Sequence, residues 1–364
     1  MVEVVRVVWV VCHLVLSDCF RCKECWKTFP RFVHISPTRK MDSTAFVKLI
    51  DQNRKIALYG AGTAVALLGL GLGYKYTRKE KKLTQVGVVS QLLVHPMKSG
   101  KAVSVDTAEC LRMGLKYGEL QDRHWLVITE DGHMVTGRQN PRLVLVSLTC
   151  EGGQLSLNGP QMEELRVPLQ QPNNAVVDCR VFSVDVQGRD CGDEVSDWLT
   201  RYLASDKTVR LVHFEPHLKA QWPSEKEPLF PRDEKVAYPD AAPIMLMTEA
   251  SVRDLNSRLD HEVTISQFRP SIVVSDCEAF TEDTWDHIQI GQVEIKRVTG
   301  CGRCIFTTVD PETGVITQKE PLNTLKTYRM TDPKQKISPI LGQYYTIKKT
   351  GVLLVGEPVY KVIC

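Results

Sequence analysis

The sequence predicts a mainly β protein with few helices (α+β), in which β-barrel units carry attached helices and follow one membrane-spanning helix. Three observations predict this class. Short segments of alternating apolar and polar residues are separated by turn residues such as Gly, Asp and Pro. Only two segments have the apolar spacing of an amphipathic helix, which disfavours a doubly wound sheet. One long uncharged segment lies near the N-terminus.

The first predicted element is this uncharged segment, residues 56–74, which is nineteen residues long. A helix needs ~20 residues to cross a hydrocarbon core of about 30 Å. Glycines within the segment are tolerated because they are common in membrane spans. Basic residues near the segment are fewer on its N-terminal side than on its C-terminal side: Lys48, Arg54 and Lys55 against Lys75, Arg78, Lys79, Lys81 and Lys82. This bias predicts that the C-terminal portion faces the cytosol.

We place the membrane anchor and its basic flank at residues 41–84 and treat residues 1–40 as a leader. The leader contains an apolar run, Val7–Leu16, that is too short to span a membrane. Its cysteines Cys19, Cys22 and Cys25 have a spacing compatible with a metal or acylation site, but we favour chance spacing in an unstructured leader. The sequence gives the leader no defined role.

The strands come next in the chain. Val86–His95 alternates as a strand. Trp125–Thr129 and His133–Thr136 flank Glu-Asp-Gly, which predicts a β-hairpin. Leu143–Cys150 and Gln154–Leu157 flank Glu-Gly-Gly and predict a second hairpin.

Two helices are predicted among the strands. Val195, Trp198, Leu199, Tyr202 and Leu203 have the spacing of one apolar helix face. In the second helix Val252, Leu255 and Leu259 form the apolar face, and Thr248 precedes it as a possible N-cap.

The part of the chain after the anchor divides into two predicted domains. Residues 221–233 are rich in proline and charge, which indicates a surface loop near the junction of two halves. We place the boundary near Glu215. This gives an N-terminal β domain at 85–215 and a C-terminal domain at 216–364.

Composition excludes several classes of protein. The chain has 364 residues with 43% hydrophobic and 24% charged residues, so it is not compositionally disordered. A net charge of +3 is too small to indicate nucleic-acid binding. Twelve cysteines without framework spacing argue against a small disulfide scaffold and suit a reducing compartment.

The segment Cys301-Gly-Arg303-Cys304 carries the strongest chemical signal. A guanidinium beside a thiol lowers the cysteine pKa and favours the thiolate, which is the form that binds metals. The β-branched and aromatic residues of Ile305–Val309 predict a strand that runs into a tight turn at Asp310–Gly314 and holds the thiol at a strand end. This combination suits an anionic metal cofactor.

A Cys-x-x-Cys pair has other interpretations. A redox dithiol expects the motif to open a helix, which the residues after Cys304 disfavour. Half of a zinc site needs a second pair at ligand spacing, and Cys277 and Cys364 are isolated. Two unrelated buried cysteines remain the alternative at this point.

Several further motifs accompany this segment in a fixed order. They are His95-Pro-Met-Lys98-Ser99, Asp122-Arg123-His124-Trp125, Phe268-Arg269-Pro270, Arg303-Cys304 followed by Thr307-Thr-Val-Asp-Pro311, and Gly342-Gln-Tyr344. Together they resemble the MOSC-domain proteins, and within that family the mitochondrial amidoxime-reducing components. The resemblance runs from about Lys82 to the C-terminus. It implies a MOSC-type β-barrel and an N-terminal MOSC β domain.

The resemblance also implies a molybdenum cofactor, Mo-molybdopterin. The thiolate of Cys304, rather than that of Cys301, would be the metal ligand and the catalytic group. The residues implied to contact the cofactor are Lys98, Ser99, Arg123, Asp240, Arg269, Ser271, Arg303 and Tyr344. Ser271 stands where relatives tend to have Asn. Soft sulfur ligands suit such a metal centre.

The function implied is reduction of N-hydroxylated compounds such as amidoximes and hydroxylamines. Electrons would come from cytochrome b5 and its NADH-dependent reductase, and this chain shows no haem or nicotinamide motif of its own. The location implied is the outer mitochondrial membrane, with the catalytic part facing the cytosol and a single N-terminal anchor. The alternative is a binding module in which Cys304 carries sulfur or a cofactor without reducing a substrate.

Overall fold

The computed structural model describes residues 82–225, 227–317, 319–331 and 337–363. The predicted membrane helix at 56–74, the leader and its cysteines lie outside this range. Within the described residues, no helix combines the length and apolar character needed to cross a bilayer. The described residues belong to one compact unit.

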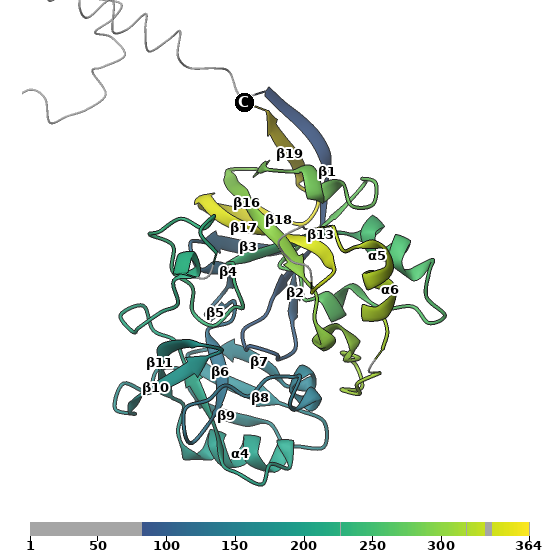
Figure 1. Cartoon of the computed structure of the whole chain (residues 1–364). Coiled ribbons are helices and arrows are strands. Elements are labelled where there is room, and N and C mark those ends of the chain that lie inside the picture. Colours follow the sequence, from purple (N-terminus) through teal and green to yellow (C-terminus); the bar gives the residue numbers. More distant parts are fainter. Residues whose placement is uncertain (1–81, 226, 318, 332–336, 364) are drawn as a thin grey trace, which may run out of the picture. The chain divides into compact units, whose positions relative to one another are not determined.

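A closed barrel of seven strands forms the centre of the C-terminal part (Figure 1). In order around the barrel these are β1 (Lys82–Val94), β14 (Ile272–Ser275), β13 (Ile244–Thr248), β17 (Ile340–Lys349), β16 (Val293–Gly302), β15 (His287–Ile290) and β19 (Pro358–Ile363). The sheet closes because β1 pairs with both β14 and β19. All pairs are antiparallel except β13 with β14, which the helix α5 (Glu249–Asn256) connects. The short strand β2 (Val103–Val105) adds to β1.

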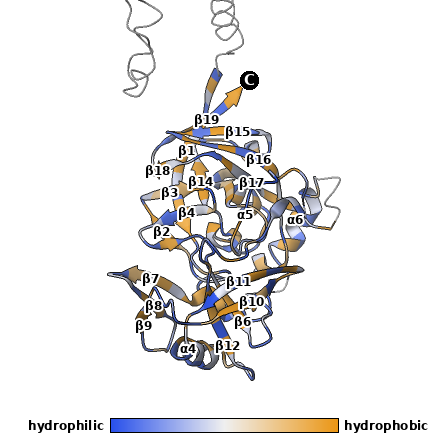
Figure 2. Cartoon of the chain, turned by 90° about the vertical axis from the view of Figure 1, so that its left-hand side faces the viewer, coloured by the Kyte–Doolittle hydropathy of each residue, from blue (hydrophilic) through white to orange (hydrophobic). Residues whose placement is uncertain are grey.

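Inward-facing and outward-facing residues alternate along the strands, and the inward-facing apolar side chains fill the barrel interior. On β17, Tyr345 and Ile347 point into the core cluster, where they meet Ile295 of β16 and Ile288 of β15. The Tyr345 hydroxyl donates to the carbonyl of Trp285 at 3.0 Å, which satisfies the polar tip of this buried ring. Figure 2 shows the resulting mixture of hydrophobic and hydrophilic residues along the barrel strands.

The remaining strands form three smaller sheets. One contains β10 (Val176–Val181), β11 (Val184–Asp190), β12 (Val209–His213) and β6 (Trp125–Thr129). A second contains β7 (Ser147–Glu151), β8 (Gln154–Asn158) and β9 (Leu165–Pro168). The third contains β18 (Gly351–Leu354), β3 (Thr107–Leu111), β4 (Gly114–Tyr117) and β5 (Leu120–Gln121). A short helix, α6 (Leu322–Tyr328), lies near α5 in Figure 1.

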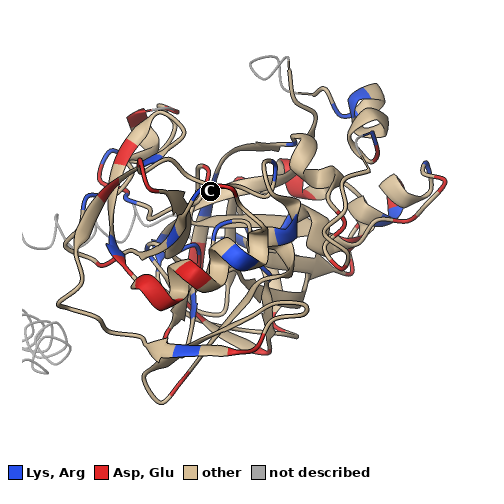
Figure 3. Cartoon of the chain, turned by 90° about the horizontal axis from the view of Figure 1, so that it is seen from below, with Lys and Arg blue, Asp and Glu red and all other residues tan. Residues whose placement is uncertain are grey.

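The helix α4 (Asp193–Leu203) packs its apolar face on the sheets of the N-terminal part. Its first turn carries Asp193 and Glu194 and its last turn carries Arg201. These charges interact favourably with the helix dipole. Figure 3 views the molecule from the side where α4 lies and shows acidic and basic residues interspersed.

Most predicted elements are confirmed. The first strand, the hairpin β7–β8 and both helices are present, and the Thr248 hydroxyl caps α5 by accepting from the Ser251 amide at 3.2 Å. The helix α5 ends at Asn256, so Leu259 of its predicted apolar face lies beyond it. The segment after the turn at Gly132 returns antiparallel to β6 through isolated bridges, with the Val135 amide bonded to the Val127 carbonyl at 2.8 Å.

Two strand predictions are wrong. The strand predicted from Leu143 begins only at Ser147, because Pro141 opens a 3-10 helix, η2 (Pro141–Leu145). The strand predicted at Ile305–Val309 is also a 3-10 helix, η6 (Ile305–Thr308). There the Thr307 and Thr308 hydroxyls donate to the carbonyls three residues earlier, at 2.9 and 2.8 Å, which stabilises the helical turn. The thiol of Cys304 therefore follows a strand end, that of β16, instead of preceding a strand.

The predicted boundary near Glu215 stays a prediction. The sheets interleave the two halves, because β1 from the N-terminal half completes the barrel and β18 near the C-terminus pairs with β3.

The backbone at Gly342 gives a stability prediction. This residue has a φ of +75°, and an added Cβ would lie 2.9 Å from Met245 Sδ and 3.0 Å from the Leu246 carbonyl oxygen. Gly153 has almost the same φ, +74°, with no atom within 4 Å of the Cβ position. Gly153→Ala should therefore cost about 1 kcal/mol of unfolding free energy from φ strain alone. Gly342→Ala should cost about 3 kcal/mol because the clash is added.

Denaturant titration of both variants measures the difference. Equal losses of unfolding free energy would contradict the packing found around Gly342.

Candidate functional site

One pocket lies beside the end of β16 and takes its walls from both halves of the chain. Eight of the predicted site residues line it: Lys98, Ser99, Arg123, Asp240, Arg269, Arg303, Cys304 and Tyr344. Ser271 does not line the pocket. It is buried, and its hydroxyl lies 3.4 Å from the Met245 amide nitrogen.

The backbone itself marks this pocket as unusual. Ser99, Arg123 and Arg269 have positive φ angles of 66°, 50° and 56°. Such strain in residues other than glycine persists only where the surrounding structure enforces it, and it gathers at functional sites. Each of the three follows a regular element closely, so short turns after β1, β5 and the 3-10 helix η4 (Ile265–Phe268) aim these side chains.

Lys98 and Asp240 form an ion pair in the pocket wall. The Lys98 ammonium also donates to the Tyr238 carbonyl at 2.8 Å and lies 5.2 Å from the centre of the Phe182 ring. Desolvation opposes ionisation of Asp240, but Lys98 and Arg123 outweigh it and lower the pKa of this carboxyl. The pair is therefore ionised at neutral pH.

A second cluster holds Arg123 and Arg269 close together. Arg123 pairs with the buried carboxylate of Asp122, and its Nη2 donates to the Arg269 carbonyl at 3.0 Å. Arg269 Nη1 donates to the Gly100 carbonyl at 2.6 Å. Burial and the repulsion from Arg123 lower the pKa of Arg269 to about 9. Asp122 thus balances Arg123, whereas no described carboxylate forms an ion pair with Arg269.

The two cysteines of the motif have different surroundings. Cys301 is buried in an apolar cluster, and its pKa is raised by desolvation, an effect that Arg303 and a hydrogen bond with Tyr344 oppose. Cys304 is exposed and lines the pocket. A ligand in the pocket can therefore reach the sulfur of Cys304. Among the described residues, no group of three His, Cys, Asp or Glu side chains is arranged to bind a metal ion, so the zinc interpretation gains no second set of ligands.

Arg303 binds the backbone of neighbouring segments, and its predicted contact with a cofactor stays a prediction. Its guanidinium donates to the Leu341 carbonyl from Nε at 2.8 Å and from Nη2 at 2.5 Å, and to the Phe268 carbonyl from Nη1 at 2.9 Å. These bonds use its donors on the backbone of two neighbouring segments. The geometry thus gives Arg303 a positioning role, although the residue also lines the pocket.

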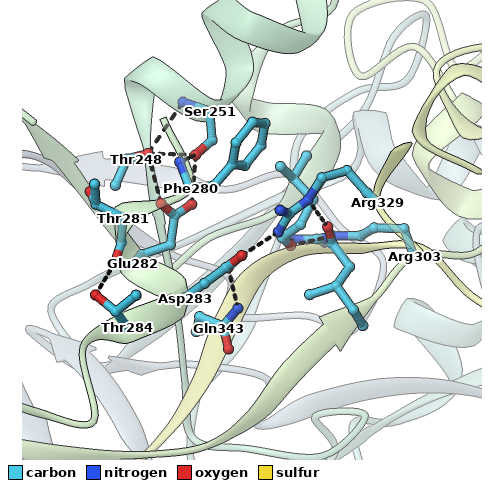
Figure 4. Close-up of polar contacts among 12 residues, drawn as sticks. Thr248, Ser251, Phe280, Thr281, Glu282, Asp283, Thr284, Arg303, Arg329 and Gln343 are labelled. Carbon is cyan, nitrogen blue, oxygen red and sulfur yellow. Dashed lines mark hydrogen bonds and ion pairs between the residues drawn. The ribbon is translucent and has the colours of Figure 1, made fainter. Parts of the chain in front are cut away.

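A polar network continues behind Arg303, as Figure 4 shows. Arg329 Nε donates to the Ile340 carbonyl at 2.8 Å, and its Nη2 pairs with Asp283 at 2.7 Å. The other oxygen of Asp283 accepts from Gln343 Nε2 at 2.6 Å. Both ends of this network hold β17 where it passes the pocket.

Next to Asp283, the carboxyl of Glu282 is fully buried with two hydroxyls. Its oxygens lie 2.8 Å from Ser251 Oγ and 3.1 Å from Thr248 Oγ1, and these two hydroxyl oxygens lie 2.7 Å apart (Figure 4). Each of these three oxygen–oxygen contacts needs one hydrogen to be a hydrogen bond. The hydroxyls of Ser251 and Thr248 supply only two hydrogens. The third proton must lie on Glu282, in agreement with the way that burial raises its pKa.

Sequence reasoning missed other pocket residues, among them Arg138, Phe182, Gln267 and Phe306. Arg138 follows the hairpin and adds a cation near Asp240. Phe306 packs closely against Gly137, where an added Cβ would lie 2.2 Å from the ring. The glycine-containing turn Thr136-Gly-Arg138 was the signal in the sequence that could have indicated Arg138. Only the contacts in the folded structure identify it as a pocket residue.

Comparisons with known proteins agree with this geometry. The MOSC N-terminal beta barrel domain matches residues 86–206, and the MOSC domain matches residues 233–360. "Mitochondrial amidoxime-reducing component 1" of Danio rerio is 79% identical over 318 residues, which cover 87% of this chain and 98% of that protein. The chain belongs to the mitochondrial amidoxime-reducing components. The resemblance found in the sequence motifs is thereby confirmed.

Human members of this family are also similar. "Mitochondrial amidoxime-reducing component 1" of Homo sapiens is 48% identical over 304 residues, which cover 82% of this chain and 90% of that protein. "Mitochondrial amidoxime reducing component 2" of Homo sapiens is 48% identical over 305 residues, covering 82% and 91%. The similarity thus extends over nearly the whole of each family member.

The proton on Glu282 gives a pH prediction. An acid whose pKa is raised by folding stabilises the fold fully below its unfolded pKa of about 4.3, and this contribution is lost as the pH rises toward the folded pKa. Glu282→Gln keeps a hydrogen-bond donor and an acceptor at this position but has no group that ionises. The variant should gain stability over the wild type as the pH rises from 4.5, by up to about 1.4 kcal/mol per pH unit.

Unfolding by denaturant at pH 4.5, 6 and 8 measures this gain. A constant difference between the two proteins would show that Glu282 is ionised in the fold.

Proposed function

We propose that this chain is a molybdenum cofactor-dependent reductase of N-hydroxylated compounds such as amidoximes and hydroxylamines. One observation carries the proposal: a single pocket combines the exposed thiol of Cys304 with several cations, of which Arg269 has no ion-pair partner among the described residues. A soft metal bound through a pterin phosphate has these two requirements. The names of the relatives, amidoxime-reducing components, support the substrate class.

The residues present fit such a cofactor. The Cys304 thiolate would bind the metal, while Lys98, Arg123 and Arg269 would bind the phosphate through charge-assisted hydrogen bonds. Ser99, Asp240 and Tyr344 would contact the pterin. When bound, the cofactor supplies a redox centre that can take an oxygen atom from nitrogen and accept electrons singly.

The protein's own residues orient and shield this chemistry. Asp122 and Asp240 fix Arg123 and Lys98 before the cofactor arrives, which lowers the entropy lost on binding. Phe182 and Phe306 contribute apolar surface to the pocket wall. Less water in the pocket strengthens every charge interaction within it.

Replacing Cys304 tests the assignment. Cys304→Ala in the full chain should abolish amidoxime reduction and lower bound molybdenum, because the metal loses its protein ligand. Cys150→Ser is a matched control, since Cys150 is a partly buried thiol outside the pocket, and it should keep both properties. Activity assays and elemental analysis measure the two properties.

Two outcomes would contradict the assignment. Full turnover by Cys304→Ala would remove Cys304 from the reaction. A persulfide on Cys304 of the wild type without bound molybdenum would favour the sulfur carrier instead.

The electron donors proposed are cytochrome b5 and NADH-cytochrome b5 reductase. Omitting cytochrome b5 from a reconstituted mixture should reduce NADH-driven turnover to background, and turnover with the reductase alone would argue against this route.

The location proposed is the outer mitochondrial membrane, with the segment at 56–74 as anchor and the catalytic part facing the cytosol. Protease added to intact mitochondria should then digest the catalytic part, whereas full protection would place it inside.

A further inference from the structure

A second cavity adjoins the proposed cofactor pocket and has no role in the function described above. The two share Gln267, Arg269 and Phe306 as walls. The second cavity has a volume of about 130 Å³ and also contacts His95. Lys101 and Glu312 line it, lie 3.6 Å apart and are largely exposed, so they mark its mouth.

His95 lines this cavity and has an unpaired acceptor. Its side chain is 1% exposed, and Nε2 lies 3.0 Å from the Pro270 carbonyl oxygen. Because a carbonyl only accepts, Nε2 carries the hydrogen. Burial, with the charges of Arg123 and Arg269, lowers the pKa of His95 far enough to keep the ring neutral, so Nδ1 has only a lone pair. Nδ1 is buried and has no partner among the described residues.

Arg269 also lines this cavity and has an unpaired donor. Its Nη2 is buried and, within the described part of the chain, has no hydrogen-bond partner. Lys101 adds a second cation at the mouth. A buried donor or acceptor without a partner costs about 1–3 kcal/mol, so a ligand that satisfies both atoms gains from each.

These two atoms define the ligand chemistry. Arg269 and Lys101 repel cations and attract anions. The lone pair of His95 Nδ1 repels an oxygen that has no hydrogen and attracts an O–H group. A single water takes about 30 Å³, and the cavity of about 130 Å³ has room for a larger ligand.

We propose that this cavity binds a small oxyanion that carries a proton, such as hydrogen phosphate, with its hydroxyl donated to His95 Nδ1 and its other oxygens bound by Arg269 and Lys101. Since Arg269 lines both cavities, the bound anion also offsets the repulsion between Arg269 and Arg123. The cavity is thereby an anion site next to the cofactor pocket, and the two sites share Arg269.

Isothermal titration calorimetry of the cofactor-loaded full chain at pH 7.4 tests this site with inorganic phosphate and sulfate. Phosphate carries a hydroxyl at this pH and sulfate does not. Sulfate should bind about tenfold more weakly or worse, because it leaves Nδ1 facing an oxygen lone pair. Equal affinities for the two anions, or no phosphate binding, would overturn the proposal; the latter outcome leaves water as the occupant.

Variants at the mouth of the cavity avoid the buried core. Lys101→Ala should weaken phosphate binding about 5-fold, and Glu312→Gln should strengthen it because Lys101 loses its competing carboxylate. Lys116→Ala is the matched control, since Lys116 pairs with Glu109 at 3.9 Å outside the cavity, and it should bind as the wild type does. If Lys101→Ala and Lys116→Ala bind phosphate alike, the site is not this cavity.

A variant of His95 tests the selectivity. His95→Gln supplies an amide that can donate as well as accept, so sulfate should approach phosphate in affinity. Arg138→Ala separates the two cavities, because Arg138 lines the first pocket and not the second, and this variant should keep the preference for phosphate over sulfate. Loss of that preference in Arg138→Ala would place the anion in the first pocket and overturn the proposal.

Discussion

The guanidinium of Arg303 holds the site together. Its donors bind the carbonyls of Phe268 and Leu341, which immediately precede Arg269 and Gly342 in two other segments. Cys304 is the next residue in its own segment. One side chain thus fixes the relative positions of the Cys304 thiol, Arg269 and the strand that carries Tyr344. A lysine could not replace it, because an ammonium lacks the fork of donors that reaches both carbonyls.

The pocket concentrates positive charge in a partly buried place, and this arrangement is costly without a ligand. Asp240 and Asp122 each balance one cation, whereas the guanidinium of Arg269 lies beside Arg123 and has no ion-pair partner among the described residues. An anionic ligand that binds only the folded state relieves this repulsion and stabilises the fold. The left-handed backbone conformations of Ser99 and Arg269 are likewise costly. Such strain is retained where it orients a functional side chain.

The sequence predicted local features well where a local force dominates. The Thr248 cap and the apolar face of α4 depend on neighbours three or four residues away, and both are confirmed. The prediction failed at Ile305–Val309, where β propensity favours a strand but threonine hydroxyls bonded to nearby carbonyls favour a 3-10 turn. Propensity is a weak prior where side chains can bond the local backbone.

By itself, the sequence determined the family, the mainly β class and a set of charged and sulfur-containing residues suited to one anionic metal cofactor. Only the tertiary structure decided which of these residues share a pocket. It separated the buried Cys301 from the exposed Cys304, removed Ser271 from the pocket wall and turned Arg303 toward backbone carbonyls. The physical reason is that the burial and the hydrogen-bond partners of a side chain depend on segments far apart in the chain. A local sequence pattern therefore cannot show which donors remain unpaired after folding.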